Sequence, residues 1–226
     1  MKRLALLLSL TCLSATSAMA ADLGWNSGTS PMYSPTPASG WSGFYAGVNA
    51  GYGFGTFSRQ PTAGGAQVDG NAGGFVIGAT AGYNADMGGF VIGAETDLQY
   101  SQVGYSETIP GIGTFKATND FFGTVRARGG MSFGQVMPFI TGGFAYGRGT
   151  ASVTDAANVV TSQSNTHYGW TLGAGLEAKA TENISIKAEY LYVDLGTQSY
   201  GGLPGVGGTD VTQRFGVIRA GLNYKF

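Results

Sequence analysis

Apolar residues alternate with small or polar residues along most of the chain. From Ser42 to Phe57 the even positions are apolar, as at Phe44 and Val48, and the odd positions are mostly Gly. A period of two places successive side chains on opposite faces and predicts β-strands with one apolar face. Eight segments show this pattern: Ser42–Phe57, Gly74–Asn84, Phe90–Tyr100, Asp120–Phe133, Pro138–Gly147, Tyr168–Lys179, Ile184–Tyr192 and Ile218–Phe226.

The connections between these segments alternate in length. Short turns are expected near Asp86, Gln135 and Glu182. The other connections are long and rich in Gly, Ser, Thr and Asn, and we expect them to be exposed loops. They cover Ser58–Gly73, Ser101–Asn119, Gly149–Thr166 and Gly196–Asp210. This alternation is typical of an up-and-down meander whose long loops all lie on one side.

The same alternation would also suit a half-buried sheet in a soluble β-sandwich. A membrane barrel is favoured because the segments have the roughly 9 to 11 residues that a tilted spanning strand needs. Aromatic residues at the ends of the apolar faces, such as Tyr52, Tyr100 and Tyr168, point the same way. The expected fold is therefore all-β: an eight-stranded antiparallel up-and-down transmembrane β-barrel over residues 42–226.

The first residues have the features of a targeting segment. Lys2 and Arg3 precede an apolar run, and Ala18-Met19-Ala20 forms a small-x-small cleavage site, so residues 1–20 are interpreted as a secretory signal peptide. Residues 21–41, rich in Pro, Ser and Gly, are expected to form a periplasmic N-terminal leader. The only cysteine, Cys12, lies in the signal peptide, so the exported chain would contain no disulfide.

Composition narrows the function classes further. The chain of 226 residues contains 40 Gly and only 11% charged residues, which is unlike a soluble helical enzyme. A formal net charge of −1 gives no basic surface for nucleic acid. His167 is the only histidine and is expected to be a solvated loop residue, so we expect no metal site, no catalytic residues and no cofactor.

Charged residues on the polar face would point into the barrel. A tight turn at Glu182 would place Glu177 opposite Lys187, and a hairpin that turns at Gly111-Ile112 would place Asp97 opposite Arg126 and Glu95 opposite Arg128. The expected lumen charges form a nearly balanced set: Glu95, Asp97, Arg126, Arg128, Glu177, Lys179, Lys187, Glu189 and Arg219.

The width of the barrel decides whether these charges form a plug or line a pore. Eight strands enclose a lumen that side chains can fill, whereas open channels need about 16 to 18 strands. A polar plug is therefore favoured over a charge-selective pore. Many inward positions are Gly, however, and a lumen short of side-chain volume would hold a file of water, which keeps a small channel open as the alternative.

Several motifs support a specific resemblance. The segments Trp41–Gly47, Phe122–Arg128, Pro138–Gly147, Gly169–Glu177 and Lys187–Gly196 resemble the porin-like eight-stranded outer-membrane proteins of alphaproteobacteria. This resemblance implies location in the cell outer membrane, among lipids and lipopolysaccharide, with roles that range over envelope integrity, host-surface interaction, haemin binding and small-solute passage. The C-terminal Tyr224 and Phe226 are similar to the signal that the barrel-assembly machinery recognises.

Together these features predict a non-enzymatic component of the Gram-negative cell envelope. Its lumen would be polar and charge-paired, and its loops would face the outside. Two alternatives stay open: a small porin-like channel for small solutes, and a surface receptor or adhesin that binds haemin, a host molecule or another small ligand through its loops.

Overall fold

The structure is a computed structural model, and it describes residues 40–61, 66–109, 111, 113–155, 158–203 and 207–226. The expected signal peptide and nearly all of the expected leader lie outside the described residues. No helix in this part of the chain is long and apolar enough to cross a membrane.

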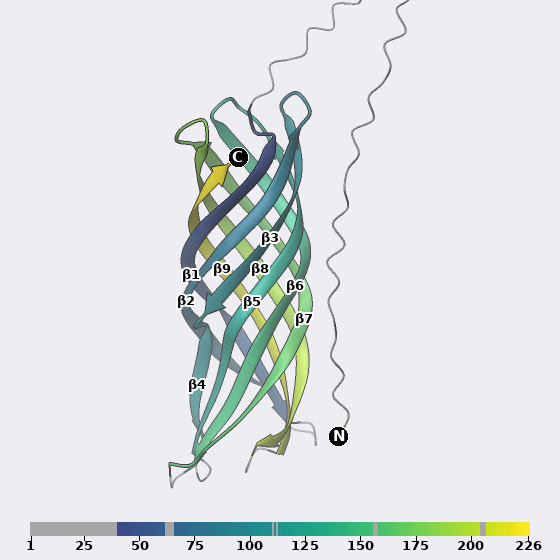
Figure 1. Cartoon of the computed structure of the whole chain (residues 1–226). Coiled ribbons are helices and arrows are strands. Elements are labelled where there is room, and N and C mark those ends of the chain that lie inside the picture. Colours follow the sequence, from purple (N-terminus) through teal and green to yellow (C-terminus); the bar gives the residue numbers. More distant parts are fainter. Residues whose placement is uncertain (1–39, 62–65, 110, 112, 156–157, 204–206) are drawn as a thin grey trace, which may run out of the picture. The chain divides into compact units, whose positions relative to one another are not determined.

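Antiparallel strands form one closed sheet (Figure 1). Because β1 pairs with both β2 and β9, the sheet closes on itself as a barrel. β3 and β4 are successive parts of one barrel strand between β2 and β5, so the predicted eight-stranded barrel is confirmed. The bounds are β1 (Gly43–Pro61), β2 (Val68–Asp86), β3 (Phe90–Ser101), β4 (Gly104–Ile109), β5 (Gly113–Met131), β6 (Val136–Asp155), β7 (Val160–Lys179), β8 (Ile184–Leu203) and β9 (Gly207–Lys225).

The expected long loops are wrong in most of their length, because the strands continue through them. β1 runs to Pro61, β6 to Asp155 and β7 begins at Val160. Apolar residues such as Phe57 and Val153 move to the inner face there, whereas Ser and Thr occupy the outer face. The sequence therefore loses its apolar outer face while the strand itself goes on.

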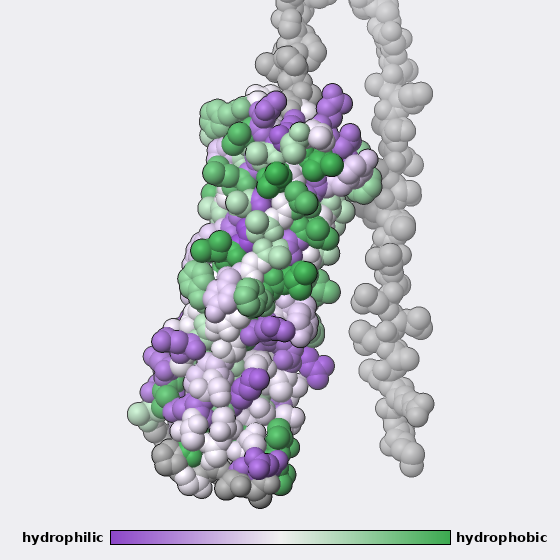
Figure 2. All heavy atoms as spheres, turned by 90° about the vertical axis from the view of Figure 1, so that its left-hand side faces the viewer, coloured by the Kyte–Doolittle hydropathy of each residue, from purple (hydrophilic) through white to green (hydrophobic). Residues whose placement is uncertain are grey.

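The barrel thus has two halves of opposite polarity. We call the end with the short connections, at the top of Figure 1, the turn end, and the opposite end the far end. Nearly all exposed large apolar side chains surround the turn half, and Figure 2 shows this change on one face. The far half instead encloses an apolar core that includes Phe57, Val76, Val103, Phe115, Phe122, Val153, Leu195, Val211, Phe215 and Val217.

In the far half the ring of strands separates into two sheets. β7 pairs with β8 only from Trp170 to Lys179, and β2 pairs with β4 at one position, Gly73 with Gly104. The sheet β8-β9-β1-β2 therefore faces the sheet β4-β5-β6-β7 across the apolar core. In Figure 1 the arrowhead of β1 ends at the lower right, while β4 runs to the lower left. The far half is thus organised as a small β-sandwich that continues from the closed barrel of the turn half.

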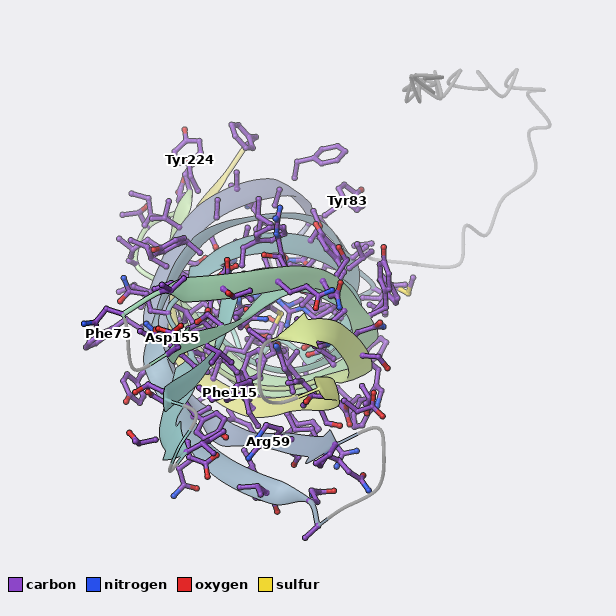
Figure 3. All side chains as sticks on the ribbon, turned by 90° about the horizontal axis from the view of Figure 1, so that it is seen from below. Arg59, Phe75, Tyr83, Phe115, Asp155 and Tyr224 are labelled. Carbon is purple, nitrogen blue, oxygen red and sulfur yellow. The ribbon has the colours of Figure 1, made fainter. Side chains whose placement is uncertain are left out.

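Side chains cross the gap between β2 and β4. Arg59 on β1 forms an ion pair of 3.4 Å with Glu107 on β4. Figure 3 shows Arg59 near Phe115 of β5, where the two sheets approach each other. Tyr105 donates a hydrogen bond of 2.8 Å to Glu107. Burial raises the pKa of Tyr105 to about 12, so its hydroxyl remains a donor at neutral pH.

Inward glycines make room for larger neighbours. A Cβ atom added at Gly51 would lie 2.2 Å from the carbonyl oxygen of Ile218 and 2.7 Å from the Cβ of Arg219. At Gly175 it would lie 2.6 Å from the ring of Phe139. The expectation that glycine leaves the lumen short of side-chain volume is therefore wrong at these positions, because neighbouring groups already occupy the space.

We predict that Gly51→Ala destabilises the barrel by about 1–3 kcal/mol, the usual cost of overpacking. The free energy of unfolding in detergent micelles, measured with urea, checks this value. Gly129→Ala is the matched control, because a Cβ there meets nothing within 4 Å, and it should leave the free energy of unfolding unchanged. Equal effects of the two substitutions would contradict the crowded lumen.

Candidate functional site: a charge network in the turn half of the barrel

Eight charged side chains occupy the interior of the turn half. They come from five strands, β3, β5, β7, β8 and β9, and their side chains are between 0% and 4% exposed. Four acidic and four basic residues make the set formally neutral: Glu95, Asp97, Glu177, Glu189, Arg126, Arg128, Lys187 and Arg219. Charges buried this deeply need close partners, because leaving water costs each of them several kcal/mol.

Arg126 lies at the centre of the network. Its guanidinium donates to Glu95, to Asp97 at 2.8 Å and to Glu189 at 2.5 Å. It also donates to the hydroxyl of Thr141 at 2.9 Å. A planar guanidinium presents several donors in fixed directions, and so one arginine joins carboxylates from β3 and β8.

Glu95 accepts hydrogen bonds from several strands. Lys187 donates to both of its carboxylate oxygens, at 2.9 and 2.8 Å, and the hydroxyl of Tyr45 on β1 donates at 2.6 Å. Tyr45 accepts in turn from Arg128 at 3.2 Å. The network thereby extends to β1 through a neutral side chain.

Arg219 completes the network from the last strand. It donates to Glu189 at 2.7 and 2.9 Å and to Asp97 at 2.9 Å. Thr124 also donates to Asp97, at 3.0 Å. Residues of β3, β8 and β9 are thus connected across the lumen by direct contacts.

A second branch lies closer to the turn end. Arg128 donates to Glu177 and places its guanidinium carbon 4.1 Å from the ring centre of Phe139. Glu177 also accepts from Ser185 at 2.5 Å and from Asn223 at 2.8 Å. The carboxylate therefore has donors from three other strands and remains fully engaged without bulk water.

The predicted register is confirmed for one hairpin and wrong for the other. Glu177 lies opposite Lys187, although their ion pairs go to Arg128 and Glu95 respectively. Glu95, however, lies opposite Arg126, and Asp97 lies opposite Thr124. The expected ion pairs of Arg126 with Asp97 and of Arg128 with Glu95 nevertheless form, at 2.8 and 3.7 Å. The pairs of β4 with β5, such as Ile109 with Gly113, already lie one position from the expected register, and the break between β3 and β4 shifts β3 by one position more.

Lys179 does not belong to the network, contrary to expectation. Near the end of β7, its ammonium lies 4.6 Å from the ring centre of Trp41, which is buried in the mouth of the barrel. The indole of Trp41 donates to the carbonyl oxygen of Gly134 at 3.2 Å and packs with Val91 and Met137. Trp41, two residues before β1, therefore packs against inward side chains at the turn end.

His167 is also placed differently from the prediction of a solvated loop residue. Because β7 begins at Val160, His167 faces inward and is completely buried. Its Nε2 lies 2.9 Å from the hydroxyl of Tyr200 on β8. This contact joins the two sheets of the far half.

Comparison with known proteins identifies the family. A family model described as an outer membrane protein beta-barrel domain matches residues 7–226. The 31 kDa outer-membrane immunogenic protein of Brucella melitensis is 39% identical, with 98% of each chain covered. The chain belongs to the outer-membrane protein beta-barrel family.

One further relative and one solved structure are similar to this outer-membrane chain over most of their length. The 25 kDa outer-membrane immunogenic protein of Brucella abortus is 33% identical, covering 84% of this chain and 81% of that protein. The outer membrane protein OprG of Pseudomonas aeruginosa, at 15% identity and a TM-score of 0.52, covers 83% of this chain and 98% of its own and shares the fold. The family model and the Brucella relatives place the chain in the outer membrane and support the resemblance found in its sequence.

The C-terminal residues of this outer-membrane barrel lie on its apolar exterior. Tyr224 and Phe226 are 51% and 75% exposed, with ring centres 5.3 Å apart. The backbone N–H of Phe226 donates to the carbonyl oxygen of Phe44 at 3.0 Å, so the end of the chain is held against β1.

Several contributors to the network were not singled out in the sequence. Tyr45, Thr124, Thr141 and Asn223 supply neutral donors and acceptors between the charges. The available signal for Tyr45 was an aromatic residue on the face otherwise occupied by Gly and Asn. Its hydroxyl explains why a large side chain is suited to that polar face.

We predict that Arg126→Ala lowers the free energy of unfolding by about 3–5 kcal/mol, since it leaves buried carboxylates without a partner. Urea titration of the protein in detergent micelles measures this loss. Arg214→Ala is the matched control: its ion pair with Asp194, at 3.0 Å, involves a side chain that is 56% exposed, and its loss should cost less than about 1 kcal/mol. Similar losses for the two variants would refute the central role of Arg126.

Proposed function

We propose that the protein is a closed, non-enzymatic structural component of the outer membrane, whose far half projects as a surface domain. One observation carries this proposal: side chains occupy the interior of the barrel along its whole length. Trp41 packs between inward side chains at the turn end, the charge network occupies the turn half, and the apolar core occupies the far half.

Orientation follows from the connections. Outer-membrane barrels place their short turns in the periplasm. The turns next to Asp86, Phe133 and Ala180 would accordingly face the periplasm, and the two-sheet far half would extend beyond the lipopolysaccharide on the outside. The polar outer face and apolar core of the far half suit that aqueous location.

The charge network favours a plug over a charge-selective pore. A selective pore needs charges that meet the passing ion, whereas every charged residue of this network has a protein partner of opposite sign. The glycines on the inner face add no free volume where neighbouring atoms fill the space beside them. Small-solute passage is therefore the less favoured function.

The proposed partners follow from the outer surface. Lipid chains would cover the apolar exterior of the turn half, and lipopolysaccharide would meet the belt of Tyr52, Tyr100 and Tyr168 at its edge. The barrel-assembly machinery would recognise the exposed Tyr224 and Phe226. Both side chains are exposed at the C-terminal end of the chain, which leaves them accessible.

We predict that the purified protein gives no large, stable conductance steps in planar lipid bilayers. Current recordings at fixed voltage measure this directly. Trp41→Ala should remain closed as well, because the charge network lies behind the residue it removes. Stable unitary steps of one size in most insertions of the unaltered protein would defeat the proposal and favour a channel.

A further inference from the structure

Four neutral polar side chains lie inside the far half, next to its apolar core. They come from four strands, β5, β7, β8 and β9, and each is 0% or 1% exposed: Asn119, His167, Tyr200 and Gln213. The hydroxyl of Tyr200 lies 2.9 Å from Nε2 of His167 and donates to the carbonyl oxygen of Gly149 on β6 at 3.2 Å. Asn119 donates to the side-chain oxygen of Gln213 at 3.0 Å. We call these four residues the polar cluster.

The members of the polar cluster converge on Gly149. A Cβ atom at this position would lie 2.9 Å from the hydroxyl oxygen of Tyr200 and 3.1 Å from Nε2 of His167. It would lie 2.4 Å from the amide nitrogen of Gln213. Because Gly149 has no side chain, polar groups from both sheets of the far half come into contact beside it.

The polar cluster joins the two sheets where they share no backbone pairing. In the part of the chain that the structure describes, the ladder between β7 and β8 ends at the pair of Trp170 with Asp194. Beyond it, the exposed side-chain amide of Asn165 donates to the carbonyl oxygen of Ser199 at 2.8 Å, and the contact of His167 with Tyr200 is buried. Since side chains make these contacts, β7 and β8 can separate there while the ladders of the turn half stay intact.

His167 is the member of the polar cluster that can gain a charge in mild acid. Burial lowers the pKa of His167 from 6.5 to about 4, and hydrogen bonding to the backbone at Leu195 and Gly196 offsets only part of this effect. Burial also raises the pKa of Tyr200, so its hydroxyl stays neutral. A charge on the imidazole ring would therefore lie in an interior that otherwise contains neutral groups.

The surrounding strands offer this charge no ion pair. Their charged residues in the far half lie at half-buried or exposed positions: Lys116 and Asp120 on β5, Arg148 and Asp155 on β6, Asp194 on β8, and Asp210 and Arg214 on β9. Asp120 accepts from two threonine hydroxyls, and Asp194 pairs with Arg214 at 3.0 Å. Across the core, Arg59 pairs with Glu107. Within the described residues His167 forms no salt bridge, so a charged ring would have only neutral acceptors.

We propose that the polar cluster is an acid-sensitive switch, in which protonation of His167 separates β7 from β8 in the far half and exposes part of the apolar core. At neutral pH the uncharged ring helps to hold the two sheets together. In acid the charged ring is better stabilised by water, which it reaches when the sheets separate. The contribution of His167 to the closed state is thus fully present above pH 6.5 and is lost as the pH falls from 6.5 to about 4.

Hydrogen exchange of the full protein in lipid nanodiscs, followed by mass spectrometry, tests this switch. Peptides that cover residues 160–169 and 197–201 report on the opening, once their rates are divided by the intrinsic exchange rate at each pH. We expect their protection to fall about 30-fold from pH 7.5 to pH 5, because the ring regains its usual pKa in the open state. Peptides that cover residues 172–179 of the turn half are the internal reference and should keep their protection.

The variant His167→Gln separates the charge from the contact. Its amide can still bond to the hydroxyl of Tyr200, but it does not titrate, so its protection at the two pH values should differ by less than about threefold. Tyr200→Phe is the matched control, because it removes the contact and keeps the titratable ring. Its protection should be lower at pH 7.5 and should still fall by about tenfold or more at pH 5.

An NMR titration of the unaltered protein keeps the test decisive if a variant does not fold. His167 is the only histidine of the chain, so a protein labelled with carbon-13 histidine and expressed without a histidine tag gives one ring signal. We expect this signal to titrate with a midpoint near pH 4.

Three results would overturn the proposal. The first is an equal loss of protection in acid for the unaltered protein and for a folded His167→Gln variant, which would assign the effect to carboxylates. The second is an NMR midpoint near pH 6.5, and the third is a far half whose protection is the same at pH 7.5 and pH 5.

Discussion

The need to neutralise charges inside a narrow barrel governs the turn half of this structure. Lipid contact reserves the outer face for apolar side chains, so polar groups have to point inward. Eight strands leave too little space for bulk water, and every inward charge must find its partner in the protein. Arg126 and Glu95 meet this need by contacting residues from several strands at once, and glycines such as Gly51 provide the space.

Beyond the apolar belt the preferred positions of polar and apolar residues are exchanged. Water now surrounds the strands, so polar residues move outward and Phe57, Phe122 and Phe215 move inward. In β5 an irregularity between Asn119 and Phe121 accompanies this change, and buried positions shift from Phe115 and Ala117 to Phe122 and Thr124. The alternating sequence suited both a barrel and a β-sandwich. The structure contains both, the barrel in the turn half and the sandwich in the far half.

The alternation of apolar and polar residues predicted the strands wherever the outward face is apolar, because contact with lipid requires apolar residues on that face. It could not predict the far ends of the strands, since Ser and Thr on an outer face are also typical of loops. The position of Lys187 opposite Glu177 follows from a tight turn. The position of Arg126 depends on the exact centre of the turn between β4 and β5 and on the break before β4, and neither leaves a local signal. The burial of His167 likewise depends on where β7 begins.

The contacts of Arg219 and Lys187 also bear on how the barrel assembles. Arg219 meets Asp97 across 122 positions of the chain, and Lys187 meets Glu95 across 92. Neither contact exists until the last strands reach the first ones, and such distant pairings make folding slow and cooperative. The early hairpins would hold their carboxylates without these cations, so the completed ring, and not any single hairpin, is the unit that can reside stably in the lipid.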